Sequence, residues 1–456
     1  IILHHSSQIY ISRYQQNAII IMDAAQLYSL YLKAGKQATT DSRNCPAGSI
    51  FFALKGESFD GNKFAKAALD KGCSYAVVDE KEYAIEGDER FIVVDDVLTT
   101  FKEMARQHRR QFNIPVIGIT GTNGKTTTKE LIAAVLSEKY NVMYTQGNFN
   151  NDVGVPKTLL TLDSCHDIAV VEMGASHPGD IRKLVEYAEP TCGMITNVGR
   201  AHLQGFGSFE GVMKTKGELY DFLKAHNSKV FLNADNEHLC KMTEERNITD
   251  IVRYGQKAAN LKVRGEVVEC APFLTFQFQV NEGEKHTISS HLIGAYNIDN
   301  MLAAITIGQE FGVSIDAICH ALENYIPSNN RSQFEQTADN KLIVDAYNAN
   351  PSSMMAALQN FNIMKADNKM AILGDMRELG EVSEEEHQKI VDFIASTNIN
   401  NVWLVGAEFA KTNCNFRKFD DVEQVKAAIA ENKPKNHCIL IKGSNGIKLF
   451  QLPELL

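Results

Sequence analysis

The sequence predicts an α/β protein of three domains, and three observations support this fold class. Its 456 residues exceed what one ordinary hydrophobic core holds, since domains commonly contain about 100–150 residues. Short apolar runs typical of buried strands alternate with stretches of helical periodicity, which favours parallel sheets covered by helices. The alternation is interrupted near residue 261 and starts again after Pro327, which indicates a further domain.

The pattern of residues 22–111 predicts the first domain, a small N-terminal α/β unit. Residues 23–34 have helical periodicity, a turn-rich stretch TTDSRNCPAGS follows, and the apolar runs SIFFAL and RFIVVDDV predict short strands. The chain starts with isoleucine instead of methionine, and patterned sequence begins only at Met22. Residues 1–21 are therefore consistent with an upstream extension of the reading frame, and we expect no function for them.

Residues 112–327 predict the central domain. IPVIGIT is typical of a buried strand, GTNGK of a glycine-rich turn and TTTKELIAAVL of a helix. The runs DIAVVEM, CGMITNV and KVFLNA predict further strands of a parallel sheet. Between about residues 261 and 293 the period shifts towards two, as in LTFQFQV, which predicts a β-rich insertion before a helix that begins near Asn297.

Residues 328–456 predict the C-terminal domain. After the polar run SNNRSQ, strand-like runs alternate with helical segments, and these runs are LIVDAY, MAILGD, NVWLVG and CILIKG. This order is typical of a Rossmann-like sheet. No repeat with a period of 20 to 50 residues is present, which argues against solenoids and propellers.

The composition narrows the class of protein. Hydrophobic residues make up 44% and charged residues 22%, as in globular proteins, and the net charge of −10 argues against a nucleic-acid partner. Nine cysteines without a CxxC pair predict reduced thiols. No apolar run approaches the roughly 20 residues that cross a bilayer, and no signal peptide is apparent, so we expect a cytoplasmic protein without a membrane span, and a monomer.

The strongest functional signal is the sequence GITGTNGKT at residues 118–126, between a strand and a helix. Glycines let backbone N–H groups converge on phosphate oxygens, and the following helix N-terminus adds positive potential. Lys125 supplies a charge and Thr126 a hydroxyl for Mg²⁺. The standard GxxxxGK[ST] spacing would place a glycine where Ile119 stands, so the loop is a variant. A merely structural turn would explain the glycines but not the Lys-Thr pair. We expect a P-loop ATPase-like domain with ATP bound by Gly121, Thr122, Asn123, Gly124, Lys125, Thr126 and Thr127.

The loop GTNGKTTT resembles that of the Mur ligases and of their relatives, the folylpolyglutamate synthases. Further segments are similar, in order and spacing, to the Mur ligases that add D-alanyl-D-alanine: GNFNNDVGVPKTLL, VVEMGAS, ITNVGRAHLQGFGS, KTKGELY, GAYNIDNMLAAI, VDAYNANP and LGDMRELG. The resemblance runs from Met22 to the C-terminal KGS. It implies an ATP-dependent amide ligase of peptidoglycan precursor synthesis, which joins D-alanyl-D-alanine to UDP-N-acetylmuramoyl-tripeptide through an acyl phosphate and releases ADP and phosphate.

The resemblance also implies a magnesium site and a set of catalytic residues. Glu172 stands at the end of a predicted strand, where parallel sheets gather ligands, and is an expected Mg²⁺ ligand together with Thr126 and His202. A lone histidine after a strand is also common as a loop-packing residue. The expected catalytic residues are Lys125, Glu172, His202 and Lys216.

By the same resemblance, Lys216 reacts with CO₂ to form a carbamate that binds Mg²⁺. Without the resemblance, Lys216 would be interpreted as an exposed lysine on a helix that begins near Thr215. A carbamate is anionic and supplies the oxygen ligands that Mg²⁺ prefers. Its formation requires the neutral amine, so we expect burial or neighbouring cations to depress the pKa of Lys216.

The resemblance implies further contacts to both substrates. Asn297 is expected at the adenine, Arg331 at the phosphates and Asp345 at the ribose. Asn297 could also cap its helix, and Arg331 could be a solvated linker residue, because its context NNRSQ lacks the glycine that the family more often has. Turn chemistry alone would also account for TDSR and for the asparagine-rich loop. The expected substrate-binding residues are Ser42 and Arg43 for the UDP part, and Asn148, Asn150, Asn151, Tyr347, Asn348 and Asn350.

Two alternatives remain. One is another ligase of the superfamily, either the Mur ligase that adds the third residue or a folylpolyglutamate synthase. The third-residue ligases commonly carry DNPR in the last domain, and this sequence has DAYNANP and LGDMRELG instead. The other is a nucleotide-dependent switch or binding module. The sequence does not indicate whether the tripeptide ends in diaminopimelate or lysine.

Overall fold

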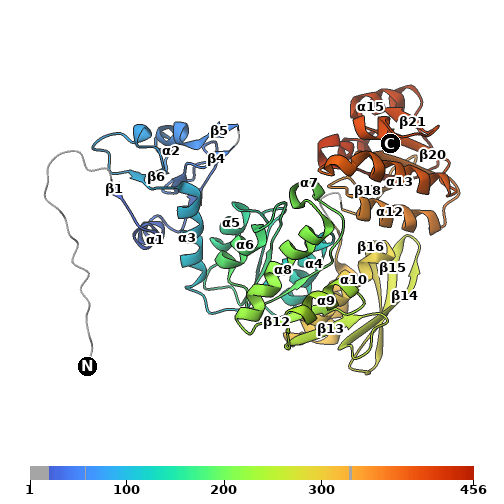
Figure 1. The fold of residues 1–456 in the computed structure, drawn as a ribbon, viewed down its shortest axis with the longest axis horizontal. Coiled ribbons are helices and arrows are strands. Elements are labelled where there is room, and N and C mark those ends of the chain that lie inside the picture. Colours follow the sequence, from blue (N-terminus) through green and yellow to red (C-terminus); the bar gives the residue numbers. More distant parts are fainter. Residues whose placement is uncertain (1–19, 57, 328–330) are drawn as a thin grey trace. The chain divides into compact units, whose positions relative to one another are not determined.

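The computed structural model describes residues 20–56, 58–327 and 331–456 (Figure 1). Most of the expected extension (residues 1–19) and the expected domain start at residue 328 lie outside the described residues. The chain divides into two compact units, Ile1–Gln111 and Phe112–Leu456. Within the ranges above, none of the helices combines the length and the apolar character that crossing a membrane requires.

The first unit is built on a parallel five-stranded sheet with the order β1-β7-β6-β3-β2. Its strands are β1 (Ile20–Ile21), β2 (Ala38–Thr39), β3 (Ile50–Phe52), β6 (Tyr75–Val78) and β7 (Phe91–Val93), with a small hairpin β4 (Lys55–Gly56) and β5 (Phe59–Asp60). Its helices are α1 (Ala24–Lys33), α2 (Ala65–Asp70) and α3 (Val97–Arg109). β1 pairs with β7, so the sheet begins two residues earlier than the sequence pattern indicated.

Helix α1 shows why the first helix begins where the sequence predicts. The Asp23 carboxylate accepts a hydrogen bond from the backbone N–H of Gln26 at 2.8 Å, and the Gln26 side chain accepts one from the N–H of Asp23 at 3.1 Å. This reciprocal capping box satisfies two N–H groups that a helix N-terminus leaves without partners. Leu27 and Tyr31 then turn into the core on the buried face of the helix.

The second unit contains two sheets. The larger sheet has the order β16-β15-β14-β13-β12-β11-β8-β10-β9, with all neighbours parallel except the antiparallel pairs β14-β15 and β15-β16. The β-rich insertion expected near residues 261–293 is therefore present, and it extends the same sheet. The strands are β8 (Val116–Thr120), β9 (Val142–Tyr144), β10 (Ile168–Glu172), β11 (Cys192–Ile195), β12 (Lys229–Asn233), β13 (Ile251–Gly255), β14 (Val263–Cys270), β15 (Phe273–Val280) and β16 (Lys285–Ile293).

Helices cover both faces of the larger sheet because successive residues of its strands point to opposite sides. Cys192 and Met194 on β11 join the core cluster that α4 and α10 build, whereas Gly193 between them faces Leu223 of α8. The helices of this region are α4 (Lys125–Ser137), α5 (Gly154–Leu159), α6 (Asp180–Ala188), α7 (Leu203–Phe206), α8 (Phe209–Ala225), α9 (Glu237–Glu245), α10 (Ile298–Glu310) and α11 (Ile315–Asn324).

The smaller sheet has the order β17-β18-β22-β19-β20-β21, in which only β17 is antiparallel to its neighbour. Ala371 and Leu373 on β19 belong to the core on the side of α12 and α13, and Ile372 belongs to the core on the side of α15. This doubly covered parallel sheet confirms the Rossmann-like prediction. Its elements are β17 (Gln333–Gln336), β18 (Lys341–Asp345), β19 (Lys369–Gly374), β20 (Asn401–Val405), β21 (Arg417–Phe419), β22 (Cys438–Lys442), α12 (Pro351–Ile363), α13 (Ser383–Ala395), α14 (Ala407–Ala410) and α15 (Val422–Glu431).

Candidate active site

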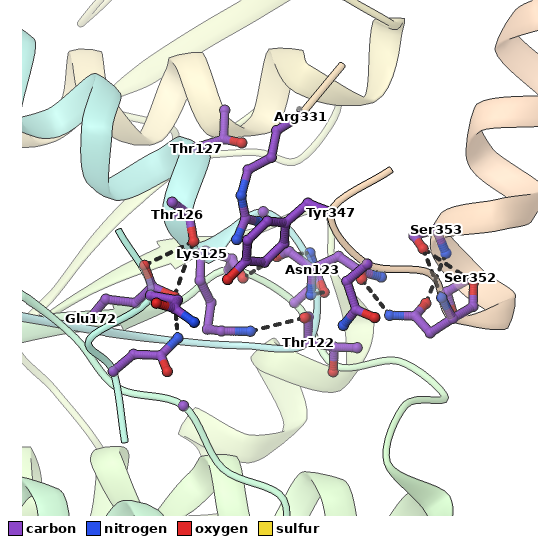
Figure 2. A pocket seen from close by; sticks show the side chains of 18 of the residues that line it. Thr122, Asn123, Lys125, Thr126, Thr127, Glu172, Arg331, Tyr347, Ser352 and Ser353 are labelled. Atoms are coloured by element: carbon purple, nitrogen blue, oxygen red, sulfur yellow. Dashed lines mark hydrogen bonds between the residues drawn. The ribbon is translucent and has the colours of Figure 1, made fainter. Parts of the chain in front are cut away.

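A cavity of about 750 Å³ in the second unit is lined by residues of both sheets (Figure 2). Most of the side chains selected from the sequence line it, although they come from segments far apart in the chain. These are Thr122, Asn123, Gly124, Lys125, Thr126, Thr127, Asn148, Asn150, Asn151, Glu172, His202, Asn297, Arg331, Asp345, Tyr347, Asn348 and Asn350. Of the remaining candidates, Gly121 lies in the loop, Lys216 is buried beside the cavity, and Ser42 and Arg43 belong to the first unit.

Two glycines of the phosphate loop have backbone conformations and neighbours that exclude a side chain. Gly121 has φ +147° and Gly124 has φ +77°, both in the region that favours glycine. A Cβ atom on Gly121 would lie 2.0 Å from Oγ1 of Thr196, and one on Gly124 would lie 2.7 Å from Oδ1 of Asn300. The loop is thus fitted closely against β11 and α10, which preorganises its N–H groups at the start of α4.

The loop is also held by hydrogen bonds from the end of β11. The backbone N–H of Asn123 donates to the side-chain oxygen of Asn197 at 2.9 Å, and the N–H of Thr122 donates to the backbone carbonyl of Asn197 at 2.9 Å. Lys125 is half-buried, and its Nζ donates to the carbonyls of Gly121 at 3.0 Å and Thr122 at 3.1 Å. Burial lowers the pKa of Lys125, and the Glu172 carboxylate opposes this shift.

Glu172 and Thr126 lie together, as the sequence predicted (Figure 2). The Glu172 side chain is fully buried at the end of β10, and its carboxylate accepts hydrogen bonds from Thr126 Oγ1 at 2.9 Å and from Asn150 Nδ2 at 2.7 Å. Across the described residues, no three His, Cys, Asp or Glu side chains gather into a group that could hold a metal ion. One carboxylate and one hydroxyl beside a phosphate loop suit Mg²⁺, which commonly binds few protein ligands together with phosphate oxygens and water.

His202 lies at the cavity wall in a left-handed conformation with φ +51°. Its Nδ1 lies against the carboxylate of Glu378, a residue that follows β19 in the smaller sheet. Burial lowers the pKa of His202, and Lys125 and Lys216 lower it further, while Glu378 acts in the opposite direction. Burial therefore favours the neutral imidazole, which retains a lone pair that could bind a cation.

Lys216 is not the exposed lysine that an unaided interpretation would expect. Helix α8 begins at Phe209, six residues before Thr215, and places Lys216 in its buried middle with 2% exposure. Its Nζ lies 3.4 Å from the carbonyl of Ala175, a residue that lines the cavity, and 5.4 Å from the ring centre of Phe206. Burial and, secondarily, the charge of Lys125 hold the pKa of Lys216 well below its usual range, as predicted.

Asn297 does not cap α10, which corrects one of the two expectations for this residue. Its backbone is helical, and its side chain makes no capping hydrogen bond. Instead, Nδ2 donates to the carbonyl of Ile293 at 2.8 Å, and Oδ1 accepts from Nδ2 of Asn300 at 2.8 Å. Asn300 in turn accepts a hydrogen bond from Thr128 of α4 at 2.9 Å, so this amide chain fixes the start of α10 against the phosphate-loop helix.

Arg331 and Tyr347 stack on one another above the phosphate loop (Figure 2). The guanidinium carbon lies 3.8 Å from the ring centre, a favourable cation-π geometry. The Arg331 Nε is buried and makes no hydrogen bond within the described part of the chain. Arg331 is half-buried, and its Nε is enclosed, so the side chain packs at the cavity instead of extending into solvent as a linker residue would.

Asp345, at the end of β18, forms an ion pair with Lys442, at the end of the neighbouring strand β22. Lys442 is only 2% exposed and also donates to the carbonyl of Asn348 at 3.3 Å. The lysine therefore fixes both the carboxylate and the loop that carries Tyr347 and Asn348 into the cavity.

Two of the expected substrate-binding asparagines also make local structural bonds. Asn350 caps α12, where its Oδ1 accepts from the N–H of Ser353 at 2.9 Å, and its Nδ2 donates to Oδ1 of Asn123 at 2.8 Å. Asn151 Oδ1 accepts from the N–H of Gly154 at 2.9 Å, at the start of α5. The hydrogen bonds that these side chains make in a turn and at a helix N-terminus thus explain in part why asparagine stands at both positions.

The TDSR segment of the first unit forms a turn. The Asp41 carboxylate pairs with the Arg43 guanidinium through Nε at 2.9 Å and Nη2 at 2.8 Å, and the Arg43 side chain is 88% exposed. The carbonyl of Ser42 accepts from Nζ of Lys71 at 2.7 Å. The first unit thus presents an ordered turn with an accessible cation.

Comparison with known proteins decides the family. Residues 36–115 match the family described as "Mur ligase family, catalytic domain", residues 119–308 match "Mur ligase middle domain", and residues 330–445 match "Mur ligase, glutamate ligase domain". The chain belongs to the Mur ligase family. The Escherichia coli Mur ligase named UDP-N-acetylmuramoyl-tripeptide–D-alanyl-D-alanine ligase is 34% identical over 427 residues, which cover 92% of this chain and 93% of that protein.

Solved Mur ligase structures share the three-domain fold. A crystal structure of MurF from Acinetobacter baumannii superposes with a TM-score of 0.83 at 29% identity and covers 91% of this chain and 92% of that one. The MurF ligase of Thermotoga maritima in complex with ADP superposes with a TM-score of 0.82 at 26% identity and covers 92% of this chain and 97% of that one.

Several cavity residues of this Mur ligase were not selected from its sequence. Lys442 stands in the KGS segment at the end of a predicted strand, and Asn300 stands in the segment NIDN, so both motifs contained a usable signal. Asn197 and Glu378 also line the cavity, but their partners are visible only in the folded chain. Each of these four residues contacts a site residue that the sequence did indicate.

Proposed function

We propose that this Mur ligase joins D-alanyl-D-alanine to UDP-N-acetylmuramoyl-tripeptide with ATP as the energy source. Relatives with this activity in their name align with more than nine-tenths of the chain. The structural observation that carries the proposal is one cavity in which the phosphate loop, the Glu172–Thr126 pair and Asp345 of the smaller sheet face the same space.

The proposed reaction has two steps. A carboxylate oxygen of the tripeptide attacks the γ-phosphorus of ATP, and ADP leaves, which gives an acyl phosphate. The amine of D-alanyl-D-alanine then attacks the acyl carbon, phosphate leaves with the former carboxylate oxygen, and the amine loses a proton as the amide forms. The loop N–H groups and Lys125 stabilise the charge that develops on the transferred phosphoryl group.

Residues of this chain would hold ATP and Mg²⁺ in that cavity. Thr126 and Glu172, with His202 beside them, would bind Mg²⁺, which neutralises phosphate charge. Asn297 would contact the adenine, and Asp345 the ribose. The stacked Arg331 has an unpaired buried donor that would turn to a phosphate oxygen.

Lys216 would act as a carbamate. Its buried amine with a depressed pKa favours the neutral form, which attacks CO₂ to form an N–C bond and releases one proton. The resulting anion would relieve the repulsion between this amine and nearby Lys125 and would supply oxygen ligands to Mg²⁺. Asn148 and Asn150 would face the sugar-peptide part of the substrate, and Ser42 and Arg43 its UDP part.

A substrate panel tests the proposed function. Purified protein is incubated with Mg·ATP and one of several acceptor and amine pairs, and phosphate release and product mass are measured. Amide formation should require both UDP-N-acetylmuramoyl-tripeptide and D-alanyl-D-alanine, and Lys125→Ala should abolish it with an unchanged circular dichroism spectrum. Amide formation only with glutamate and a folate, or only with a dipeptide acceptor and a diamino acid, would assign another ligase activity. Phosphate release without any acceptor would favour a nucleotide-dependent switch.

A further inference from the structure

Lys129 is a fully buried lysine that the reaction outlined above does not use. It stands one helical turn after Lys125 on α4, and its side chain has 0% exposure. Its Nζ donates a hydrogen bond of 2.7 Å to the backbone carbonyl of Thr145 and lies 5.5 Å from the ring centre of Tyr144. Burial of an ammonium group is costly, so a fully buried lysine with a short, specific hydrogen bond indicates a definite task.

The partner of Lys129 lies at a weak point of the larger sheet. Thr145 directly follows β9, which is the edge strand of the larger sheet and, among the residues that the structure describes, pairs with β10 alone. The strand has three residues, so few ladder hydrogen bonds hold its carboxyl end. Lys129, on α4, supplies a hydrogen bond to the backbone carbonyl of the residue that directly follows this short strand.

Thr145 connects this lysine to Glu172. The Thr145 hydroxyl is fully buried and accepts a hydrogen bond of 3.0 Å from the backbone N–H of Glu172. The N–H of Thr145 donates to the carbonyl of Val170 at 3.0 Å, which completes its attachment to β10. The position of Thr145 therefore bears directly on the backbone that carries the Glu172 carboxylate.

Thr145 also anchors the asparagine loop, residues 146–151, which begins directly after it. Asn150 in this loop reaches back to the Glu172 carboxylate at 2.7 Å, and its carbonyl accepts from the N–H of Gly174 at 2.7 Å. Hydrogen bonds thus join the asparagine loop to the Glu172 carboxylate. The loop begins after Thr145, whose backbone carbonyl accepts the hydrogen bond from Lys129.

The side of Lys129 away from Thr145 is also ordered. The Glu130 carboxylate lies 3.5 Å from Nζ and accepts a hydrogen bond of 2.5 Å from the hydroxyl of Tyr325. The Lys129 ammonium therefore contacts both a carboxylate and the carbonyl of the residue that follows the edge strand, and it does not line the cavity of the candidate active site.

We propose that Lys129 is a positioning residue: by holding the Thr145 carbonyl it fixes both the Glu172 carboxylate and the asparagine loop for Mg²⁺ and substrate. The inference rests on the proposed function for its activity readout. Removal of residues that orient a metal ligand typically lowers metal affinity or activity about 10- to 100-fold, and that range is expected here.

The test compares Lys129→Met with Lys139→Met. Lys139 is a matched control, because its Nζ also donates to a backbone carbonyl, that of Gly312 at 2.9 Å, and lies 5.1 Å from a tyrosine ring centre, but it is exposed and does not line the cavity. The Mg²⁺ concentration for half-maximal phosphate release should rise about 10- to 100-fold in Lys129→Met and stay near the wild-type value in Lys139→Met.

A second readout does not depend on activity. Amide hydrogen exchange, measured by mass spectrometry, should speed up at least about tenfold in Lys129→Met for peptides that cover the asparagine loop and Glu172, and peptides from the smaller sheet should be unchanged. Thr145→Val removes the hydroxyl acceptor of Glu172 at constant shape and should raise the Mg²⁺ requirement in the same direction, whereas Thr145→Ser should keep it low. These two variants carry the test if Lys129→Met does not fold.

Wild-type Mg²⁺ dependence and wild-type exchange in both Lys129→Met and Thr145→Val would overturn the inference. A uniform rise of exchange across the whole second unit would also overturn it, because it would indicate a purely structural role. Failure of the proposed function would be distinguishable, since the wild-type protein itself would then make no amide while the exchange readout would still report on the asparagine loop.

Discussion

Replacement of Glu172 by glutamine tests the central pair of the site at nearly constant shape. Glutamine keeps the volume of the side chain, but it removes the charge and has a single acceptor oxygen. In the structure, the two carboxylate oxygens accept from different donors, Oε2 from Thr126 Oγ1 at 2.9 Å and Oε1 from Asn150 Nδ2 at 2.7 Å. In the glutamine variant one of these two donors faces an amide NH₂ group instead of an acceptor oxygen, and neither donor keeps a charged acceptor.

The expected loss of activity follows from the loss of one hydrogen bond to a charged acceptor. A hydrogen bond to a charged group contributes about 1.5–3 kcal/mol, and about 1.36 kcal/mol in transition-state stabilisation corresponds to a factor of ten in rate. Loss of one such bond predicts a decrease in kcat/KM of about 10- to 150-fold, and the weaker Mg²⁺ site adds to it.

Initial rates of phosphate release at several Mg²⁺ concentrations measure the effect. Glu310→Gln is the control, because Glu310 also accepts from two side chains, Lys229 and Lys262, but does not line the cavity. A Glu172→Gln enzyme within about threefold of the wild type at every Mg²⁺ concentration would refute the reasoning.

Two further predictions concern buried bases. Lys216→Ala should lose most of kcat with a smaller effect on nucleotide affinity, and short carboxylates should partly restore it; Lys216→Arg should be inactive, and removal of dissolved CO₂ should lower wild-type activity. An active Lys216→Arg enzyme together with CO₂-independent wild-type activity would contradict the carbamate. His387 is fully buried, its Nδ1 donates to the Ser383 carbonyl at 2.7 Å, and its Nε2 accepts from the N–H of Met376 at 3.0 Å. Burial lowers its pKa despite nearby Asp375 and Glu408, so the folded state binds fewer protons than the unfolded state as pH falls below about 6.5. The free energy of unfolding should therefore decrease below that pH, by at most about 1.4 kcal/mol per pH unit from this residue. Urea titrations should show a shallower decrease in His387→Gln, and parallel curves would contradict the assignment.

The sheets could be predicted where their strands are long and apolar. β8, β10 and β22 are fully buried, and β19 is buried after its first residue, Lys369, so each left a continuous hydrophobic run in the sequence. β17 and β21 are edge strands of three or four residues with half-buried or exposed polar side chains, and they leave no such run. Edge strands are the elements for which local sequence carries the weakest signal.

The sequence indicated most of the residues that form the site, but not how their side chains contact one another. Topology brings strand ends together, which is why Glu172 and Asp345 line the same cavity. The burial of Lys216 could be expected only through the resemblance, because it depends on how α8 packs, and a lysine in a helix is most often exposed. The pairing of Asp345 with Lys442 joins residues 97 apart in the chain, and no local pattern encodes such a pair.

The variant glycine spacing of the phosphate loop has a consequence for loop exchange between ATPases. Ile119, at the position where the standard loop has glycine, is fully buried in the core that α4 and α10 share. A graft of the standard loop would therefore open a void there, which typically costs about 2–5 kcal/mol when a large aliphatic side chain is removed. It would also place a side chain at Gly121, 2.0 Å from Thr196 Oγ1. The two loop types are thus specific to their host sheets, and a chimera would need β11 and α10 transferred with the loop.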